Sequence, residues 1–300
     1  MAAINRVDVL CIGHASFDLI FTVPVHPKAD DKIVANSFSD CGGGPAANAA
    51  VMASRLGLKA AFSGYLGDDF YGEKHYRELL ADNISTELIV RGHTPTPLST
   101  IIVKPTGERA LINYKGDTQA LSAGAIDFSG ITPKVILADG HEPKISLDAI
   151  EIAHKKSIPT ILDAGSLHAG TELLMDKVDY LICSEKFAHQ FARDASKALR
   201  SLSKISANVV ITLGDKGVIW QRGHETGQLS AYHVKTIDST GAGDAFHGAF
   251  AAAMAKQLGW LDSLRYASAA GSLCCTKIGA RTGLPYLTEH QALFKKPLSD

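Results

Sequence analysis

Short apolar segments alternate with longer helical segments along most of this chain, and no other feature of the sequence limits the fold as much. The apolar segments are rich in β-branched residues, and the segments between them carry the apolar spacing and end signals of helices. The predicted strands are 7–12, 60–65, 86–90, 134–138, 160–163, 180–183, 209–213 and 217–221, and the predicted helices include 46–56, 69–82, 146–156, 242–258 and 261–276. Strands joined through helices lie parallel, so this rhythm predicts an α/β fold with a mostly parallel sheet covered on both faces.

Two β-rich segments without helices, 13–40 and 94–117, interrupt this alternation. In the second, strands at 99–104 and 109–114 flank a Pro/Gly turn, which predicts a hairpin. In the first, 32–38 is a further candidate strand. We expect the two segments to meet as a small β-sheet lid over one end of the main domain, which then comprises residues 1–12, 41–93 and 118–300.

The composition is that of an ordinary globular protein and excludes several classes of function. The net charge is −1 across 300 residues, without the basic stripe that a dedicated nucleic-acid binder would carry. The most apolar run, around 248–258, is interrupted by Lys256, so no segment reaches the roughly 20 apolar residues of a membrane span. The first strand is too short and too acidic for a signal peptide, and the five cysteines lack paired spacing. We therefore expect a cytoplasmic protein that binds neither membranes nor nucleic acids.

The segment 238–246, with the sequence DSTGAGDAF, is the strongest chemical signal. Glycines at a helix start let the backbone approach an anion, and the free N–H groups of the first helical turn bind phosphate. Asp244 in the same turn would repel phosphate, but it is well placed to take a proton from an attacking hydroxyl. An ordinary helix start with an acidic first turn is the alternative. No G-x-x-x-x-G-K-[ST] loop and no protein-kinase motif set occurs.

This segment resembles the D-T-x-G-A-G-D signature of the ribokinase-like (PfkB) carbohydrate kinases, and 42–57 resembles the family's G-G-x-x-x-N-x-A helix start. The resemblance spans essentially the whole chain. It implies a three-layer α/β/α domain with a small β-sheet lid, and ATP-dependent phosphorylation of a sugar hydroxyl. It further implies that Asp244 is the base and that the amides of Gly241, Ala242 and Gly243 form the anion hole.

The same resemblance assigns binding residues. Asp18 and Asn48 match residues that hold sugar hydroxyls, and Gly43 and Gly44 match a double glycine that contacts the sugar and acts as the lid hinge. On the nucleotide side, the matching positions are Thr212, Gly214 and Gly217 around the ATP phosphates and ribose, and Gly279 where the family closes the adenine and monovalent-cation region.

One family motif is missing, which bears on the metal. The N-x-x-E motif that orders water around magnesium is replaced by a stretch with Ser184 and Phe187 at the two positions, and Glu185 is the substitute candidate. Mg²⁺ is still expected with ATP, because the β- and γ-phosphate oxygens must be neutralised. Whether K⁺ activates the enzyme is left open.

The chain further resembles the ketohexokinases and sulfofructose kinases, which share this departure. Lys32, Asn113 and Asp139 match substrate-facing positions there, whereas His141 stands where an arginine would bind a sulfonate. An imidazole is a poorer anion partner than a guanidinium, so a neutral ketose such as fructose is favoured over a charged sugar.

The sequence leaves two alternative functions and the role of His247 open, and it predicts an oligomeric state. A nucleoside kinase of the same fold could stack a base on Phe17, Phe21 or Phe38, and a non-catalytic sugar-binding regulator is a more distant alternative. His247, one turn after Asp244, could serve packing or function. The exposed edges of a small lid sheet predict a homodimer that pairs through the lids.

Overall fold

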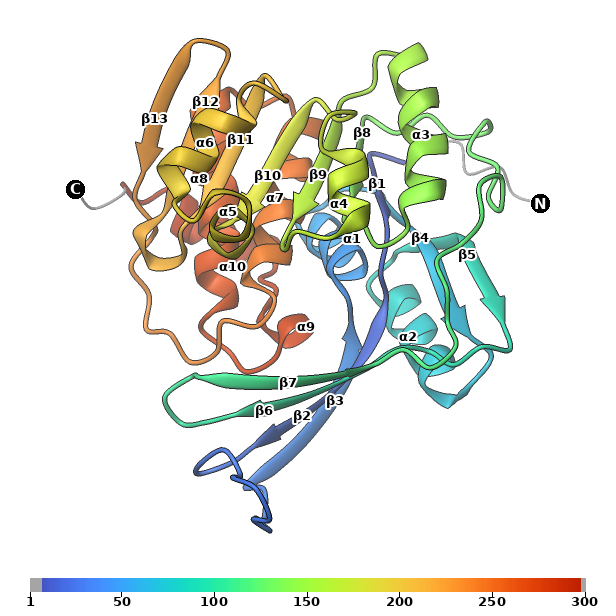
Figure 1. Cartoon of the computed structure of the whole chain (residues 1–300), viewed down its shortest axis with the longest axis vertical. Helices are drawn as coiled ribbons and strands as arrows, with labels where there is room; N and C mark the ends of the chain where they lie inside the picture. The colour runs from blue at the N-terminus through green and yellow to red at the C-terminus, as the bar shows by residue number, and fades with distance from the viewer. Residues whose placement is uncertain (1–6, 298–300) are drawn as a thin grey trace.

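The computed structural model describes residues 7–297, and a nine-stranded sheet runs through the centre of this part (Figure 1). All neighbouring strands are parallel except at one edge, where β12 is antiparallel to both β11 and β13. Their order across the sheet is β13 (Glu225–Leu229), β12 (Val218–Arg222), β11 (Asn208–Thr212), β10 (Tyr180–Ser184), β9 (Thr160–Ala164), β8 (Val135–Ala138), β1 (Val9–Ile12), β4 (Ala60–Gly67) and β5 (Ser85–Gly92). The predicted three-layer α/β fold is confirmed.

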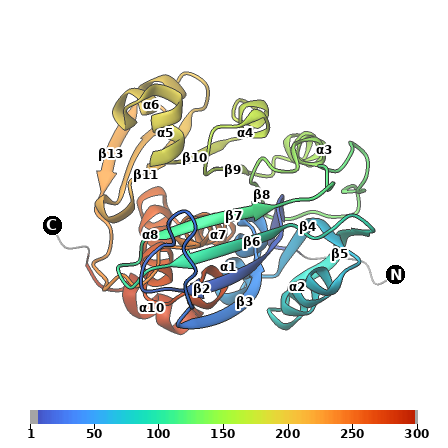
Figure 2. The ribbon, with the colours of Figure 1, turned by 60° about the horizontal axis from the view of Figure 1, so that its bottom comes forward.

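Helices cover both faces of this sheet, as Figure 2 shows. One face carries α1 (Pro45–Arg55), α2 (Phe70–Ala81), α7 (Ala242–Ala255) and α8 (Trp260–Cys274), with α10 (Leu287–Phe294) packed on α8; the other carries α3 (Pro143–Lys155), α4 (Ala169–Leu174), α5 (Glu185–Ala192) and α6 (Ala195–Leu202). Side chains alternate between the faces along each strand: Leu137 belongs to the apolar cluster that includes α1 and α7, and Ala138 belongs to the cluster on the face of α3 to α6. Among residues 7–297, no helix is long and apolar enough to cross a membrane.

Small residues let α1 and α7 approach closely, and this contact later places the site. The buried face of α1 is mostly alanine. Gly248 of α7 lies so close that a Cβ there would sit 2.5 Å from the carbonyl oxygen of Ala49. The close approach brings Asn48 on α1 alongside Asp244 on α7, because both lie near the amino ends of their helices.

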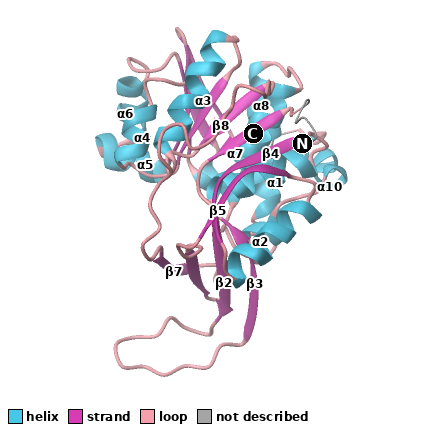
Figure 3. Ribbon diagram, turned by 90° about the vertical axis from the view of Figure 1, so that its right-hand side faces the viewer, coloured by secondary structure: helices cyan, strands magenta, loops and turns pink. Residues whose placement is uncertain are grey.

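The four-stranded small sheet forms a separate layer below the main domain in Figure 1. Its order is β3 (Ser37–Gly43), β2 (Ser16–Thr22), β6 (Leu98–Val103) and β7 (Arg109–Tyr114), with β2 and β6 parallel and the other pairs antiparallel. The prediction of a strand at 32–38 is wrong for most of its length, because the polar connection 23–36 forms the long loop seen in Figure 3. Strand β3 continues past the expected boundary at residue 40 to Gly43.

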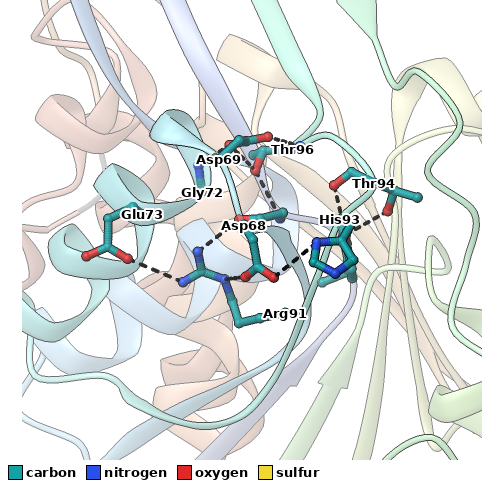
Figure 4. A network of polar contacts seen from close by, with 10 residues as sticks. Asp68, Asp69, Gly72, Glu73, Arg91, His93, Thr94 and Thr96 are labelled. Atoms are coloured by element: carbon teal, nitrogen blue, oxygen red, sulfur yellow. Dashed lines mark hydrogen bonds and ion pairs between the residues drawn. The ribbon is translucent and has the colours of Figure 1, made fainter.

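A polar network braces the connection from β5 to the small sheet (Figure 4). Asp69 caps α2 by accepting the N–H of Gly72 at 2.7 Å. The same carboxylate accepts the N–H of Thr96 at 2.7 Å and its hydroxyl at 2.9 Å. Burial raises the pKa of Asp69, but the donors of Thr96 and Gly72 outweigh it and lower the pKa overall. One side chain therefore holds the start of a helix and the chain that leads into β6.

We expect Asp69→Ala to lower the free energy of unfolding by about 2 kcal/mol, from one lost cap and two lost bonds to Thr96. Thermal denaturation should show a melting temperature roughly 3 °C below that of the wild type. Asp194→Ala is the matched control, because Asp194 caps α6 through the N–H of Lys197 and makes no second attachment within the described chain. It should cost only about 1 kcal/mol. Equal losses in the two variants would show that the bonds to Thr96 add nothing.

Candidate active site

The segment 238–244 folds as a tight turn into the amino end of α7. Asp238 is fully buried and holds the turn: its carboxylate accepts the N–H and hydroxyl of Thr240 at 2.9 and 2.7 Å and the N–H of Gly279 at 2.8 Å. Gly241 precedes the helix with φ +78°, and a Cβ there would lie 2.5 Å from the Cβ of Ala280. Glycine is thus required at this position. Among the described residues, the N–H groups of Gly241 and Gly243 donate to no protein acceptor and can bind an anion, whereas the N–H of Ala242 lies 3.3 Å from the carbonyl oxygen of Ser239.

Two cavities lie on either side of this turn, and the start of α7 forms part of the wall of each. A cavity of about 320 Å³ includes Asp244 and Thr240 in its wall, and one of about 410 Å³ includes Ala242 and Gly243. The first opens toward the small sheet, since its lining takes in Leu98, Ser99, Ile101, Leu111, Asn113 and Tyr114 of β6 and β7. A carboxylate and a set of helix N–H groups therefore meet at the boundary between two binding spaces.

Asp244 has one strong partner. The Nδ2 of Asn48 donates to Oδ2 of Asp244 at 2.7 Å. Burial raises the pKa of Asp244, and the hydrogen bond from Asn48 opposes this by stabilising the charged form. A carboxylate whose pKa is raised by burial is a stronger base than an exposed carboxylate, which suits it to act as a general base.

Asp18 is the second carboxylate of the cavity near the small sheet. It is buried on β2, accepts the hydroxyl of Ser16 at 3.1 Å, and has its pKa raised by burial to about 6. Gly43 on β3 faces it, and a Cβ on Gly43 would overlap the Asp18 carboxylate. Gly44, with φ +94°, begins α1, and a Cβ there would lie 2.5 Å from the carbonyl oxygen of His14.

Of the four other residues that the sequence assigned to the sugar, two line this cavity and two do not. Asn113 and His141 line the cavity. Asp139 is buried, and backbone N–H groups occupy it: Oδ2 accepts from His14 at 2.8 Å and Ala46 at 3.1 Å, and Oδ1 accepts from His141 at 2.8 Å. It holds three backbone segments together and does not line the cavity as the structure describes it. Lys32 is exposed in the 23–36 loop, also away from the lining.

On the nucleotide side, Thr212, Gly214 and Gly217 line the larger cavity with Ala242 and Gly243. Gly279 lies on the far side of the turn, where its N–H binds Asp238. Glu185 is partly exposed at the start of α5, with the Nζ of Lys216 at 3.9 Å, and lies outside the lining residues. Over residues 7–297, no group of three His, Cys, Asp or Glu side chains could hold a metal ion. The wall of the larger cavity also includes His233, Ser272 and Cys275, which belong to none of the sequence motifs.

His247 lies beneath the turn. Its Nδ1 is 2.6 Å from the carbonyl oxygen of Gly243 and 3.2 Å from Oδ2 of Asp163, and its Nε2 is 3.3 Å from the carbonyl oxygen of Ile182. Burial raises the pKa of Asp163 to about 7, and His247 acts in the opposite direction. His247 thus anchors the carbonyl of Gly243, and hence the turn, to the central sheet.

Comparison with known proteins gives the same family as the two motifs. The model of the pfkB family carbohydrate kinases matches residues 7–287. The ribokinase of Bacillus subtilis strain 168 is 30% identical over 291 residues, covering 95% of this chain and 99% of that protein. The "Probable fructokinase-4" of Arabidopsis thaliana is 29% identical over 331 residues, covering 98% and 99%. The crystal structure of ribokinase from Thermotoga maritima superposes with a TM-score of 0.86 at 25% identity, covering 97% of this chain and 100% of that one.

The turn with Asp244, the two cavities beside it and the match over nearly the whole chain agree with one another. This protein belongs to the pfkB family of carbohydrate kinases and is an ATP-dependent phosphotransferase with an alcohol group as acceptor.

Proposed function

We propose that this carbohydrate kinase transfers the γ-phosphoryl group of ATP to a hydroxyl of a small neutral sugar, with Asp244 as the base. The observation that carries this proposal is the position of the α7 start between the two cavities. A sugar in the cavity of about 320 Å³ would lie beside the Asp244 carboxylate, and the triphosphate of ATP in the other would lie beside the amides of Ala242 and Gly243.

In this arrangement Asp244 accepts the proton of the sugar hydroxyl as its oxygen attacks the γ-phosphorus. The amides of residues 241–243 stabilise the negative charge that develops on the transferred group. Mg²⁺ would neutralise the β- and γ-phosphate oxygens. The described residues offer no cluster of ligands for it, so we propose that ATP itself brings the metal. The prediction that Glu185 helps to order it stays a prediction, and activation by K⁺ stays an open question.

The chemistry of the first cavity favours a neutral polyhydroxyl substrate. Asp18 and Asp244 place two carboxylates in its wall, with the amide of Asn48 beside them, and Lys115 is the single Lys or Arg side chain among the described residues that line it. Carboxylates accept hydrogen bonds from hydroxyl groups but repel a phosphate or carboxylate on the substrate. Curated relatives of this chain include ribokinases and a probable fructokinase, so a pentose or a ketohexose such as fructose is the proposed substrate.

The phenylalanines that the sequence suggested as stacking partners for a nucleoside base do not line the sugar cavity. Phe17 is fully buried, and Phe21 and Phe38 pack on each other with ring centroids 5.0 Å apart. None of the three is among the described residues that line the cavity, where Tyr114 is the one Phe, Tyr or Trp side chain. A purine in the sugar cavity would therefore lack the predicted stacking partners.

Pairing of two copies through the small sheets also remains a proposal. The sheet exposes Phe38, Ile112 and Tyr114, each more than half accessible. Light scattering at assay concentration would support the pairing with a mass of two chains and oppose it with a mass of one.

The test of the proposed function is an ADP-release assay with Mg-ATP against ribose, fructose, 2-keto-3-deoxygluconate, fructose 6-phosphate, sulfofructose and adenosine. We expect turnover on a neutral sugar and little on the phosphorylated and sulfonated sugars. Turnover on adenosine alone would replace the proposal by a nucleoside kinase, and preference for a charged sugar would overturn the argument from Asp18 and Asp244.

A further inference from the structure

Arg281 is a buried cation close to the proposed base. It lies in α9 (Ala280–Gly283) and is 5% exposed. Its Nε is 3.2 Å from Oδ1 of Asn48, and its Nη2 is 3.1 Å from Nε2 of His75. The nearest carboxylate oxygen paired with it is Oε2 of Glu78, 3.9 Å from Nη1. A charge buried this deeply is costly unless the protein uses it or pairs it.

The contacts of Arg281 determine which way the Asn48 amide points. A guanidinium has only donors, so the atom of Asn48 that faces Nε must be the carbonyl oxygen. The amide nitrogen of Asn48 then faces Oδ2 of Asp244, at 2.7 Å, and donates to it. Without Arg281 the amide could rotate by 180° and present its oxygen to the carboxylate, which would lose a donor and gain a repulsive contact.

We propose that Arg281 is a positioning residue for phosphoryl transfer: it locks the Asn48 amide in the orientation that donates to Asp244, and so keeps the base ionised. The proposal rests on the proposed role of Asp244. The same cation lowers the pKa of Asp18, against the larger effect of burial, so it supports both carboxylates of the sugar cavity. The link continues to the small sheet, because Oε2 of Glu78 also accepts the N–H of Gly42 at 2.7 Å.

The sign of the pH effect follows from these contacts. Asp244 must be ionised to accept a proton, so activity falls on the acidic side as its pKa is approached. Losing the donated hydrogen bond removes a contact that favours the ionised form, so the acidic limb should move to higher pH. The other charged or titratable groups that act on Asp244 are His247, Arg109, Asp139, Asp163, Asp18 and Cys274. Those that act on Arg281 are Glu78, Asp82, Arg55, His75, Cys41 and Asp18.

The test is the pH profile of kcat/KM for the sugar in Arg281→Met. We expect the acidic limb to move up by about one pH unit, which is a roughly tenfold loss of activity at a pH on that limb, with KM for ATP unchanged. Arg281→Lys keeps a cationic donor, so its acidic limb should lie close to the wild-type position. In an Asn48→Leu background, Arg281→Met should add no further shift, because the link is already broken.

Arg55→Met is the matched control. Arg55 is a mostly buried arginine on the same side of the molecule, with its side chain 10% exposed, and it donates to the carbonyls of Arg281 and Leu284 and to Asp82. It should lower the melting temperature and leave the acidic limb in place. If the acidic limb of the pH profile does not move in Arg281→Met, and Asp244→Asn is inactive, the proposal is overturned. If Arg281→Met does not fold, an unmoved acidic limb in Asn48→Leu overturns it in the same way. Retained activity in Asp244→Asn would instead refute the base assignment itself.

Discussion

Asp244→Asn should lower kcat by roughly 10³-fold, while KM for ATP changes little. The amide has the shape of the carboxylate and can still accept the hydrogen bond from Asn48, but it cannot take a proton from the sugar hydroxyl. Burial raises the pKa of Asp244, which means that the folded state holds the ionised form at a cost near neutral pH. The variant should therefore fold as well as the wild type or better. ADP release and thermal denaturation on the same preparation measure both effects.

Asp262→Asn is the control for this substitution. Asp262 also lies in the first turn of a helix, α8, but it is exposed and pairs with Arg265. We expect wild-type kcat. Loss of activity in Asp244→Asn together with a lower melting temperature would point to a damaged fold and would contradict the assignment of the base.

Gly43→Ala should reduce kcat/KM for the sugar by roughly 10²-fold, the second largest effect that we expect. A Cβ at residue 43 would overlap all three atoms of the Asp18 carboxylate group, so that group must turn away from its place in the cavity and from Ser16. The loss should appear in the constants for the sugar and not in KM for ATP, because residue 43 lies outside the lining of the nucleotide cavity.

The paired control is Gly130→Ala. No atom lies within 4 Å of a Cβ built on Gly130, and its φ is outside the left-handed region, so alanine should be tolerated there. Wild-type sugar kinetics in Gly43→Ala would show that Asp18 does not hold the substrate, and the cavity would need another recognition group.

The α/β fold could be predicted from the sequence because each central strand is a run of buried apolar residues next to a helix with clear end signals. Elements without such signals were missed. Strand β13 (ETGQL) is a polar edge strand, and α4 has only six residues, with a histidine as its cap. The motif around Asp244 could be interpreted through its resemblance to the D-T-x-G-A-G-D signature, because glycines and an acid at a helix start also fit an ordinary helix start.

Contacts between distant segments could not be read in the same way. Asn48 and Arg281 are 233 residues apart, and their hydrogen bond depends on how α9 is placed against α1. Asp139 shows the reverse: its type and place suggested substrate binding, but the three backbone N–H groups that it accepts appear only once the chain is folded. Residue type limits what a side chain can do, and the neighbours decide which of those roles remains.

Three glycines at the crossings between the two sheets lie against a polar side chain that fills the space of a missing Cβ: Gly13 against Asp139, Gly42 against His75, and Gly43 against Asp18. This has a consequence for how such a sequence can diverge. A larger residue at any of the three glycines is excluded until its partner has become smaller, and two of the partners are carboxylates close to the sugar cavity. Each pair should therefore change together or not at all, and descendants that exchange both members of a pair are where a new substrate preference is expected to arise.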